Sequence, residues 1–399
     1  MLPEGWEEIP LHEAANYRRG SFPQPYGLAK WFDKDNGFPF VQVFDISDSL
    51  TLKPTTKTKI SRLAAEQSVF APKGSILVSL QGSIGRVAIS QYDAYVDRTV
   101  LIITGYKKPV DNLFFALVLE VLFAKEKELA PGGTIKTITK STLNNFTISL
   151  PPLPEQKKIA AILSTWDRAI EGTEKLLANS QQQKKALIQQ LLTGKKRLPG
   201  FTGAWKKVSL EKTGKVVSGG TPDTTVPAYW DGDVLWLTPT DVTSLRGKYV
   251  DDTKRKITQT GIKDSATTLL PAGSLLVCTR ATIGYMAIAK KAITTNQGFK
   301  NIVFNKFFLP EFVYYFLCTQ KHEMQRLASG STFAEISKKD FCKIHISAPP
   351  LPEQKAIAAV LSTADEEITA IESDLTRLRQ EKKALMQQLL TGKRRVKVD

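Results

Sequence analysis

Two stretches of the chain have nearly the same sequence. PPLPEQKKIAAILST begins at Pro151, and PPLPEQKAIAAVLST begins at Pro349, 198 residues later. Aligned without a gap, residues 151–197 and 349–395 are identical at 30 of 47 positions. This repeat constrains the fold more than any other feature, because two segments so similar must form the same structure twice.

The duplication continues upstream in less similar sequence. PKGSILVSLQGSIG from Pro72 aligns with PAGSLLVCTRATIG from Pro271, and GGTIKTITK from Gly132 aligns with GSTFAEISK from Gly330. Each copy is therefore a diverged region, here called a head, followed by a nearly identical spacer. The predicted division is head 1 over residues 1–150, spacer 1 over 151–197, head 2 over 198–348 and spacer 2 over 349–399. We infer that the spacers do the same job twice, whereas the heads do different jobs.

Each spacer has the start and stop signals of one long helix. Proline near the first turn loses no hydrogen bond, glutamate there favours the positive end of the helix dipole, and glycine ends a helix. The expected start residues are Pro154, Glu155, Pro352 and Glu353, and the expected stops are Gly194 and Gly392.

Apolar residues recur through each spacer with the 4–3 spacing of a coiled coil. Seven of ten such positions from Ile159 to Leu191 are apolar, and so are nine of ten in the second spacer. A helix of about 38 residues is about 57 Å long and needs a partner; we expect the two spacers to pack antiparallel, although dimerisation alone is an alternative role. These apolar positions form the seam of the coiled coil, and Lys184 and Lys382 interrupt it at equivalent places in the two spacers. Their ammonium groups could extend into solvent, or they could form a polar layer that sets the register.

The heads are predicted to mix helices and strands without a regular alternation. Short apolar runs bounded by turn residues predict strands, and longer apolar stretches predict helices at residues 113–129 and 310–327. The predicted strands are FVQVFDI, SILVSL and VAIS in head 1, and VLWLTP, SLLVCT and MAIA in head 2.

The chain carries a net charge of +16, which favours a polyanionic partner, either nucleic acid or a membrane surface; a merely basic soluble protein without such a partner is the alternative. The start, MLPEGWEEIP, lacks the apolar run of a signal peptide, and the apolar stretch 113–123 is too short to span a bilayer. Three cysteines without a CxxC pair and three histidines do not predict a zinc site. We expect reduced thiols in a cytoplasmic protein without a membrane partner.

Matching loops in the two heads carry residue types that suit DNA. Arginine and lysine can contact phosphates or guanine, glutamine can pair with adenine, and hydroxyl groups serve both uses; each could equally be a solvated surface residue or part of a plain turn. The candidates in head 1 are Arg18, Arg19, Ser21, Gln81, Ser83, Arg98, Thr134, Lys136 and Lys140. The candidates in head 2 are Ser218, Thr221, Lys254, Arg255, Lys256, Arg280, Thr282, Gln297, Lys300, Ser331, Thr332 and Lys338.

Catalytic signatures are not found in the sequence. The double prolines lack the Asn/Asp before and the aromatic residue after that a base-flipping amino-methyltransferase uses, and there is no phosphate-binding loop. Asp93 and Asp97 could form a nuclease-like pair, but head 2 has no carboxylate at the matching stretch. Asp45 and Asp241 also correspond, and capping of a strand end is the simpler role for them than catalysis. We expect no catalytic residue, no metal and no cofactor.

The repeat LPPLPEQKKIAAILSTWD with LLTGK, together with YWDGDVLWLTPTDV, GSLLVCTRATIG and TTNQGFK, resembles the specificity subunit of type I restriction–modification systems. The resemblance implies an α+β fold with two mixed target-recognition domains, separated by two long antiparallel coiled-coil helices in a pseudo-twofold internal repeat. Each domain would read one half of a bipartite, asymmetric double-stranded DNA sequence. The helices would fix the gap and dock two modification (methyltransferase) subunits, through which motor–nuclease restriction subunits would join.

By this resemblance the docking positions are the motif residues of the two spacers. They are Pro154, Glu155, Gln156, Leu191, Leu192, Thr193, Gly194, Pro352, Glu353, Gln354, Leu389, Leu390, Thr391 and Gly392. The NQGFK motif of head 2 is replaced by VDRTV in head 1. Two other functions stay open at this point: a DNA methyltransferase or nuclease with an unfamiliar site in one head, and a structural coiled-coil adaptor.

Overall fold

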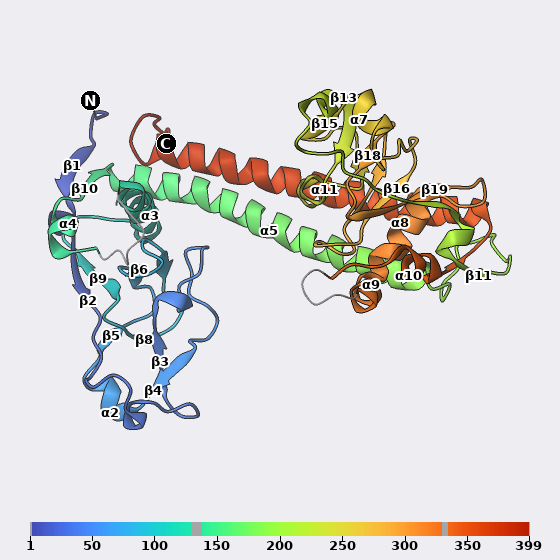
Figure 1. Cartoon of the computed structure of the whole chain (residues 1–399). Coiled ribbons are helices and arrows are strands. Elements are labelled where there is room, and N and C mark those ends of the chain that lie inside the picture. Colours follow the sequence, from blue (N-terminus) through green and yellow to red (C-terminus); the bar gives the residue numbers. More distant parts are fainter. Residues whose placement is uncertain (1, 130–137, 329–333, 399) are drawn as a thin grey trace. The chain divides into compact units, whose positions relative to one another are not determined.

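The computed structural model describes residues 2–129, 138–328 and 334–398. The chain forms two compact units: unit 1 contains Met1–Glu174 and Ser373–Asp399, and unit 2 contains Lys175–Glu372. Two helices of 39 residues each, α5 (Leu153–Leu191) and α11 (Leu351–Leu389), contribute to both units. Each unit is therefore one head together with part of both spacer helices (Figure 1).

Head 1 is built on two four-stranded sheets and one strand pair. The sheet orders are β2-β9-β6-β7 and β4-β3-β8-β5, and β1 pairs with β10. Its strands are β1 (Glu7–Pro10), β2 (Ala15–Arg19), β3 (Phe38–Val41), β4 (Thr58–Ile60), β5 (Val69–Ala71), β6 (Ile76–Ser79), β7 (Val87–Ile89), β8 (Ala94–Val96), β9 (Val100–Tyr106) and β10 (Thr147–Leu150). Its helices are α1 (Leu11–Ala14), η1 (Ala29–Trp31), η2 (Val43–Asp45), α2 (Arg62–Ala65), α3 (Asn112–Leu129) and α4 (Lys140–Asn144).

Head 2 repeats this framework with local differences. The sheet orders are β12-β19-β16-β17-β14 and β15-β13-β18, and β11 pairs with β20. Its strands are β11 (Lys206–Ser209), β12 (Gly214–Ser218), β13 (Trp230–Leu237), β14 (Tyr249–Val250), β15 (Arg255–Ile257), β16 (Leu275–Cys278), β17 (Met286–Ala289), β18 (Thr294–Thr295), β19 (Phe299–Phe304) and β20 (His345–Ala348). Its helices are η3 (Leu210–Lys212), η4 (Pro227–Tyr229), α6 (Pro239–Ser244), α7 (Gln259–Lys263), α8 (Pro310–Thr319), α9 (Lys321–Leu327) and α10 (Lys338–Lys343).

The parts of α5 and α11 within each unit lie side by side and run antiparallel (Figure 1). Polar pairs between the helices show the direction, because the residue number falls on α11 as it rises on α5. The pairs are Asp167–Lys382 and Glu174–Arg379 in unit 1, and Ser180–Glu367 and Lys184–Asp365 in unit 2. The prediction of two long antiparallel helices is confirmed.

The two seam lysines form polar layers between the helices. Lys382 Nζ lies 2.5 Å from Asp167 Oδ1, and Lys184 pairs with Asp365 at the equivalent position of the repeat. The side chains of Lys382 and Lys184 are 14% and 27% exposed, so most of each is covered. The interpretation as a register-setting layer is supported, since only one alignment of the helices joins both ion pairs.

Both long helices end as the sequence predicts. Gly194 and Gly392 have φ angles of +69° and +71°, the left-handed conformation that glycine adopts at little cost after a helix. The same closing hydrogen bond follows in each copy: the Lys196 amide donates to the Gln190 carbonyl at 3.2 Å, and the Arg394 amide donates to the Gln388 carbonyl at 3.1 Å.

These two glycines give a matched pair of substitutions. A Cβ at Gly392 would lie 2.8 Å from Pro3 Cδ, whereas at Gly194 its nearest neighbour would be the Trp205 ring at 3.6 Å. The left-handed backbone costs either alanine variant about 1–2 kcal/mol. We expect Gly392→Ala to lower the melting temperature more than Gly194→Ala, because Pro3 must also move. Equal shifts in differential scanning calorimetry would show that the contact with Pro3 does not matter.

Two predicted elements are wrong in part. The run FVQVFDI is strand only to Val41, after which η2 begins, because the Asp45 and Gln42 side chains cap each other's backbone in a tight turn. The predicted helix over residues 310–327 is two helices, α8 and α9, with a break at Gln320. The other predicted strands and the helix at 113–129 form near their predicted places. Within the described residues, no helix combines the length and the apolar character needed to cross a bilayer.

Candidate nucleic-acid interface

In head 1, four segments far apart in the sequence meet beside the β2-β9-β6 strands. Arg19 Nη2 donates to the Ile138 carbonyl at 2.6 Å, and the Ile138 amide donates to the Leu80 carbonyl at 3.0 Å. The Leu80 amide in turn donates to the Thr99 carbonyl at 2.8 Å. We call residues 18–21, 80–83, 96–99 and 138–140 the head 1 rim. The rim brings together the predicted residues Arg18, Arg19, Ser21, Gln81, Ser83, Arg98 and Lys140.

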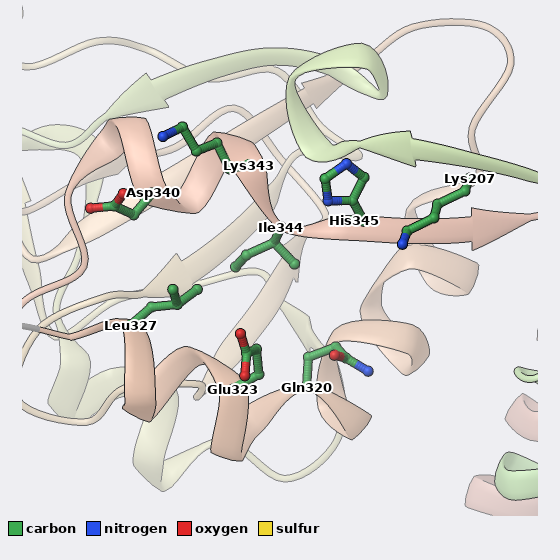
Figure 2. Close-up of a pocket in the computed structure, with 8 residues that line it drawn as sticks. All are labelled: Lys207, Gln320, Glu323, Leu327, Asp340, Lys343, Ile344 and His345. Atoms are coloured by element: carbon green, nitrogen blue, oxygen red, sulfur yellow. The ribbon is translucent and has the colours of Figure 1, made fainter.

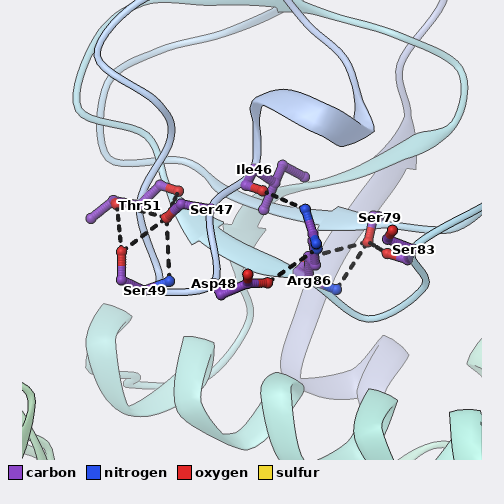
Figure 3. Close-up of polar contacts among 8 residues, drawn as sticks. All are labelled: Ile46, Ser47, Asp48, Ser49, Thr51, Ser79, Ser83 and Arg86. Carbon is purple, nitrogen blue, oxygen red and sulfur yellow. Dashed lines mark hydrogen bonds and ion pairs between the residues drawn. The ribbon is translucent and has the colours of Figure 1, made fainter. Parts of the chain in front are cut away.

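The turn that carries Gln81 and Ser83 is held from its base (Figure 3). Ser79 Oγ donates to the Ser83 carbonyl and accepts from the Arg86 amide at 2.9 Å. Arg86 reaches to the neighbouring loop, where Nη1 donates to the Ile46 carbonyl at 3.3 Å and Nε lies 3.2 Å from Asp48 Oδ1. Ser83 is exposed and Gln81 partly exposed at the end of this fixed turn.

Head 2 assembles an equivalent rim. The Gly219 amide donates to the Phe299 carbonyl at 3.1 Å, the Thr279 amide to the Gly298 carbonyl at 2.8 Å, and the Ile336 amide to the Thr279 carbonyl at 2.9 Å. We call residues 218–221, 279–282, 296–300 and 335–338 the head 2 rim. It brings together the predicted residues Ser218, Thr221, Arg280, Thr282, Gln297, Lys300 and Lys338.

The turns of the two rims share an unusual backbone. Ala281 has φ +61°, at the position where head 1 has Gly82 with φ +66°. A left-handed alanine costs free energy, and such strain persists where the surroundings demand the conformation. Arg280 in head 2 therefore occupies the position of Gln81 in head 1 on a turn of the same shape.

Two side chains of head 2 that were predicted to contact DNA, those of Lys300 and Thr282, have buried polar groups. The Lys300 side chain is 7% exposed, and its Nζ lies 2.9 Å from Glu335 Oε1, so this ion pair ties the segment after residue 333 to β19. The Thr282 hydroxyl is buried. A contact of either side chain with DNA stays a prediction and would need the local structure to open.

The KRK run lies on the second sheet of head 2. Lys254 is exposed, and Lys256 Nζ is 3.3 Å from Asp252 Oδ1. The Arg255 guanidinium lies 3.8 Å from the centre of the Trp230 ring. Sequence reasoning missed this tryptophan, although the stretch WDGDVLW contains two tryptophans at an even spacing, which is the signal for one face of a strand.

Four of the predicted residues, Thr134, Lys136, Ser331 and Thr332, lie outside the described residues. Lys140 and Lys338 are the first residues of α4 and α10.

The paired aspartates after β3 and β13 are structural. Asp45 Oδ2 accepts from the Gln42 amide at 2.9 Å and Oδ1 from the Lys57 amide at 3.0 Å. Asp241 makes the equivalent bonds to the amides of Thr238, at 2.9 Å, and Lys254, at 3.3 Å. Burial raises the pKa of Asp45, and the bonds from the Lys57 and Gln42 amides oppose that rise. The capping role expected from the sequence is confirmed.

The other carboxylates considered for chemistry hold separate turns. Asp93 Oδ1 accepts from the Lys73 amide at 2.7 Å, and Asp97 Oδ1 accepts from the Thr99 amide at 2.9 Å. In the described part of the chain, no three His, Cys, Asp or Glu residues are grouped so that they could hold a metal ion.

A shallow pocket of about 360 Å³ lies in unit 2 between α9, α10 and the β11-β20 pair (Figure 2). Lysine, glutamate, aspartate and histidine side chains line it, so its charges are of both signs. None of the predicted DNA-binding residues lines this pocket, and the rims are the better candidates.

The residues of the predicted docking motifs bind other parts of the chain within each unit. Glu155, which is 2% exposed, accepts from Arg395 Nη2 at 2.8 Å and from Trp6 Nε1 at 3.2 Å. Burial alone would raise the pKa of Glu155, but the hydrogen bonds from Arg395 and Trp6 lower it overall. Glu353 accepts from Arg197 Nη2 at 2.6 Å in the second copy.

The glutamines beside these glutamates are equally buried. Gln156 Oε1 accepts from the Asp111 amide at 2.9 Å, and Gln354 Oε1 accepts from the Leu309 amide at the same distance. Leu191, Leu192, Leu389 and Leu390 lie in the cores. Docking by these motifs stays a prediction, and in this conformation only their exposed members can reach a partner. Those are Pro154, Thr193, Pro352 and Thr391.

With this geometry established, comparison with known proteins decides the family. The family described as "Type I restriction modification DNA specificity domain" matches residues 3–179 and again residues 203–378. The chain belongs to this family. The two matches follow the internal repeat, and they place the chain among the specificity subunits of these systems rather than among the catalytic ones.

Relatives of known name agree with this assignment. The putative type I restriction enzyme MjaX specificity subunit of Methanocaldococcus jannaschii is 28% identical over 442 residues, which cover 99% of this chain and 95% of that protein. The MjaIX specificity subunit of the same organism is 36% identical over 164 residues, 41% of this chain and 38% of that protein.

Solved structures show the same fold. The S subunit of a type I restriction–modification system from M. genitalium has a TM-score of 0.60 at 14% identity, covering 98% of this chain and 96% of that one. A chain from a study of complex assembly in the type I system has a TM-score of 0.65 at 18% identity, covering 98% and 99%.

Proposed function

We propose that this specificity subunit reads a bipartite, asymmetric DNA sequence, with one half-site bound by each head. The strongest support is that the two heads share the same backbone framework but carry different side chains at equivalent rim positions. Gln81 in the head 1 rim is replaced by Arg280 in the head 2 rim, on turns of the same shape. Glutamine and arginine suit different base edges, so two such rims would read different half-sites.

The charge of the chain fits phosphate contacts around these rims. Exposed cations lie at Arg18 and Arg98 in head 1 and at Lys254 and Lys338 in head 2. Contacts with phosphates position a protein on the duplex, while base-edge contacts supply specificity. The net charge of +16 is in keeping with a polyanionic partner.

We further propose that the spacer helices dock two modification (methyltransferase) subunits, and that restriction subunits join through these. Two spacers identical at 30 of 47 positions offer two nearly equal surfaces, which suits two copies of one partner. In this view residues 1–150 and 198–348 are the target-recognition domains, and residues 151–197 and 349–399 are the shared docking segments.

Single-molecule sequencing of methylated DNA tests the bipartite reading. In a host that expresses this chain with its methyltransferase partner, we expect one methylated motif with two short defined parts and a gap of unread base pairs. Truncation or exchange of one head should change one part only. A continuous motif, or two identical parts, would contradict the assignment of a separate half-site to each head.

The remaining alternatives differ in what the purified chain does alone. A subunit without catalysis should neither methylate nor cleave DNA that is incubated with S-adenosylmethionine and Mg²⁺, whereas an unfamiliar enzyme would do one or the other. A DNA reader should also lose affinity steeply as salt rises, with a slope of about −0.9 per neutralised phosphate. A structural adaptor would show no such slope.

A further inference from the structure

Arg255 lies against two tryptophan rings of head 2. Its exposed guanidinium lies 3.8 Å from the Trp230 ring centre and 5.2 Å from that of Trp236. The two rings pack edge to face, with centres 5.0 Å apart. Among the residues that the structure describes, Arg255 has no ion pair; the nearby Asp252 is paired with Lys256.

Hydrogen bonds fix both tryptophans under this guanidinium. Trp230 Nε1 donates to the Asp223 carbonyl at 3.0 Å, and Trp236 Nε1 donates to the Gly220 carbonyl at 3.0 Å. Trp230 and Trp236 are 8% and 4% exposed. Because Gly220 belongs to the head 2 rim, the second bond also joins the Arg255 stack to the rim. The guanidinium therefore packs on two fixed rings beside the residues expected to meet DNA.

Head 1 has a different group at the same place. Thr58 pairs with Phe40 in the sheet as Arg255 pairs with Trp236, and the preceding residues, Lys57 and Lys254, both donate their amides to the capping aspartates. Thr58 Oγ1 donates to Gln42 Oε1 at 2.9 Å, so head 1 has an uncharged network there. The heads share the framework at this position and differ in its chemistry.

We propose that Arg255 reads a guanine in the half-site bound by head 2. This deepens the proposed function and rests on it. A guanidinium stacked on a fixed ring keeps its N–H fork in one plane and loses little rotamer freedom on bonding, unlike the flexible ammonium group of a lysine. That fork matches the O6 and N7 acceptors of guanine in the major groove. Side chains alternate along a strand, so Lys256 lies on the opposite face of β15 from Arg255, while Lys254 precedes the strand.

Selection from a randomised duplex library with the full-length chain tests this inference. The wild type should recover a two-part motif with a guanine in the part read by head 2. Arg255→Lys keeps the charge but loses the planar fork, and Arg255→Thr installs the head 1 residue. Both should reduce discrimination for that one guanine by about 5- to 150-fold, the range of a bidentate arginine–guanine contact, and leave the other part of the motif unchanged.

Two controls separate the possible results. Gln81→Ala, in the head 1 rim, should change the other part of the motif and so identifies which part belongs to which head. Lys254→Ala should weaken binding to all sequences alike and reduce the salt slope by about one phosphate. If the wild type recovers a two-part motif but both Arg255 variants keep every base preference or weaken all sequences equally, the inference is overturned and the proposed function stands. If the wild type selects no motif, the proposed function itself fails.

Discussion

Replacing Asp365 with alanine is expected to destabilise unit 2 by about 3 kcal/mol, the lower end of the cost of stranding a buried charge. Asp365 on α11 pairs with Lys184 on α5, and its Oδ2 lies 3.4 Å from Lys248 Nζ in head 2. The Lys248 side chain is only 9% exposed, and its Nζ also donates to the Tyr315 hydroxyl at 3.0 Å. One carboxylate therefore serves two lysines. Hydrogen exchange measured by mass spectrometry should show faster exchange in residues 175–191.

The matched control is Asp167→Ala in unit 1, which should cost clearly less. Among the described residues, the ion pair of Asp167 is with Lys382, and Glu120 on α3 supplies a second carboxylate near that lysine. Burial raises the pKa of Glu120; Lys382 lowers it, and the negative charge of Asp167 raises it further. Without Asp167, the repulsion that helps to raise the pKa of Glu120 is removed, and the Glu120 side chain remains close enough to Lys382 to interact with its charge. The corresponding residue in α8 is Cys318, which has no such charge to offer. Equal destabilisation by the two substitutions would refute this account.

The pH dependence of stability gives a second measurement on the same pair. Burial acts to raise the pKa of Asp365, but the hydrogen bonds from Lys184 and Tyr315 lower it overall. The stabilisation is therefore present above the ordinary pKa of an aspartate and is lost as the pH falls through the lower folded value. Asp365→Ala should remove this part of the acid dependence of unit 2, as followed by urea unfolding across that range.

The spacers could be predicted from the sequence almost to the residue, because their signals are local. Pro154 and Gly194 lie at the two ends of one continuous heptad pattern, and α5 runs between them as expected. The sequence alone could not show whether Lys184 forms a polar layer. The partner of Lys184 is Asp365, which lies 181 residues away and next to the apolar seam rather than on it. A heptad pattern finds the apolar seam and gives no information about which charge faces a buried lysine.

The heads were harder to predict because their edges and turns depend on distant residues. The apolar runs of β6 and β16 identified central strands, whereas the mixed sequence of β2, ANYRR, gave no strand signal, although β2 pairs along β9. Aligning the two copies identified the rim loops. The sequence did not show that these loops lie together, because they are joined by backbone hydrogen bonds between distant residues, such as the bond from the Ile138 amide to the Leu80 carbonyl. The Arg255 stack was missed because Trp230 lies 25 residues away in the sequence and reaches the arginine only through the pairing of β13 with β15.

Inserting one heptad into each long helix should lengthen the gap between the two parts of the methylated motif. Insertions after Glu174 in α5 and after Glu372 in α11 fall between the two units, so each unit keeps its own pairs between the helices. Seven residues add about 10 Å of helix, or about three base pairs at 3.4 Å each. A whole heptad also preserves the apolar seam and turns one end of the helix by only about 20° relative to the other.

A one-sided insertion is the control that separates length from damage. Seven residues added to α5 alone would shift Lys184 about 10 Å along α11 and away from Asp365. The Asp167–Lys382 pair in unit 1 would still favour the original alignment of the two helices. That variant should lose stability and methylate little DNA at any spacing, whereas the paired insertion should methylate a motif with the same two parts and a longer gap. If the paired variant is stable and still methylates at the original gap, the helix pair does not set the distance between half-sites, and the gap must be determined by the partner subunits or by the heads themselves.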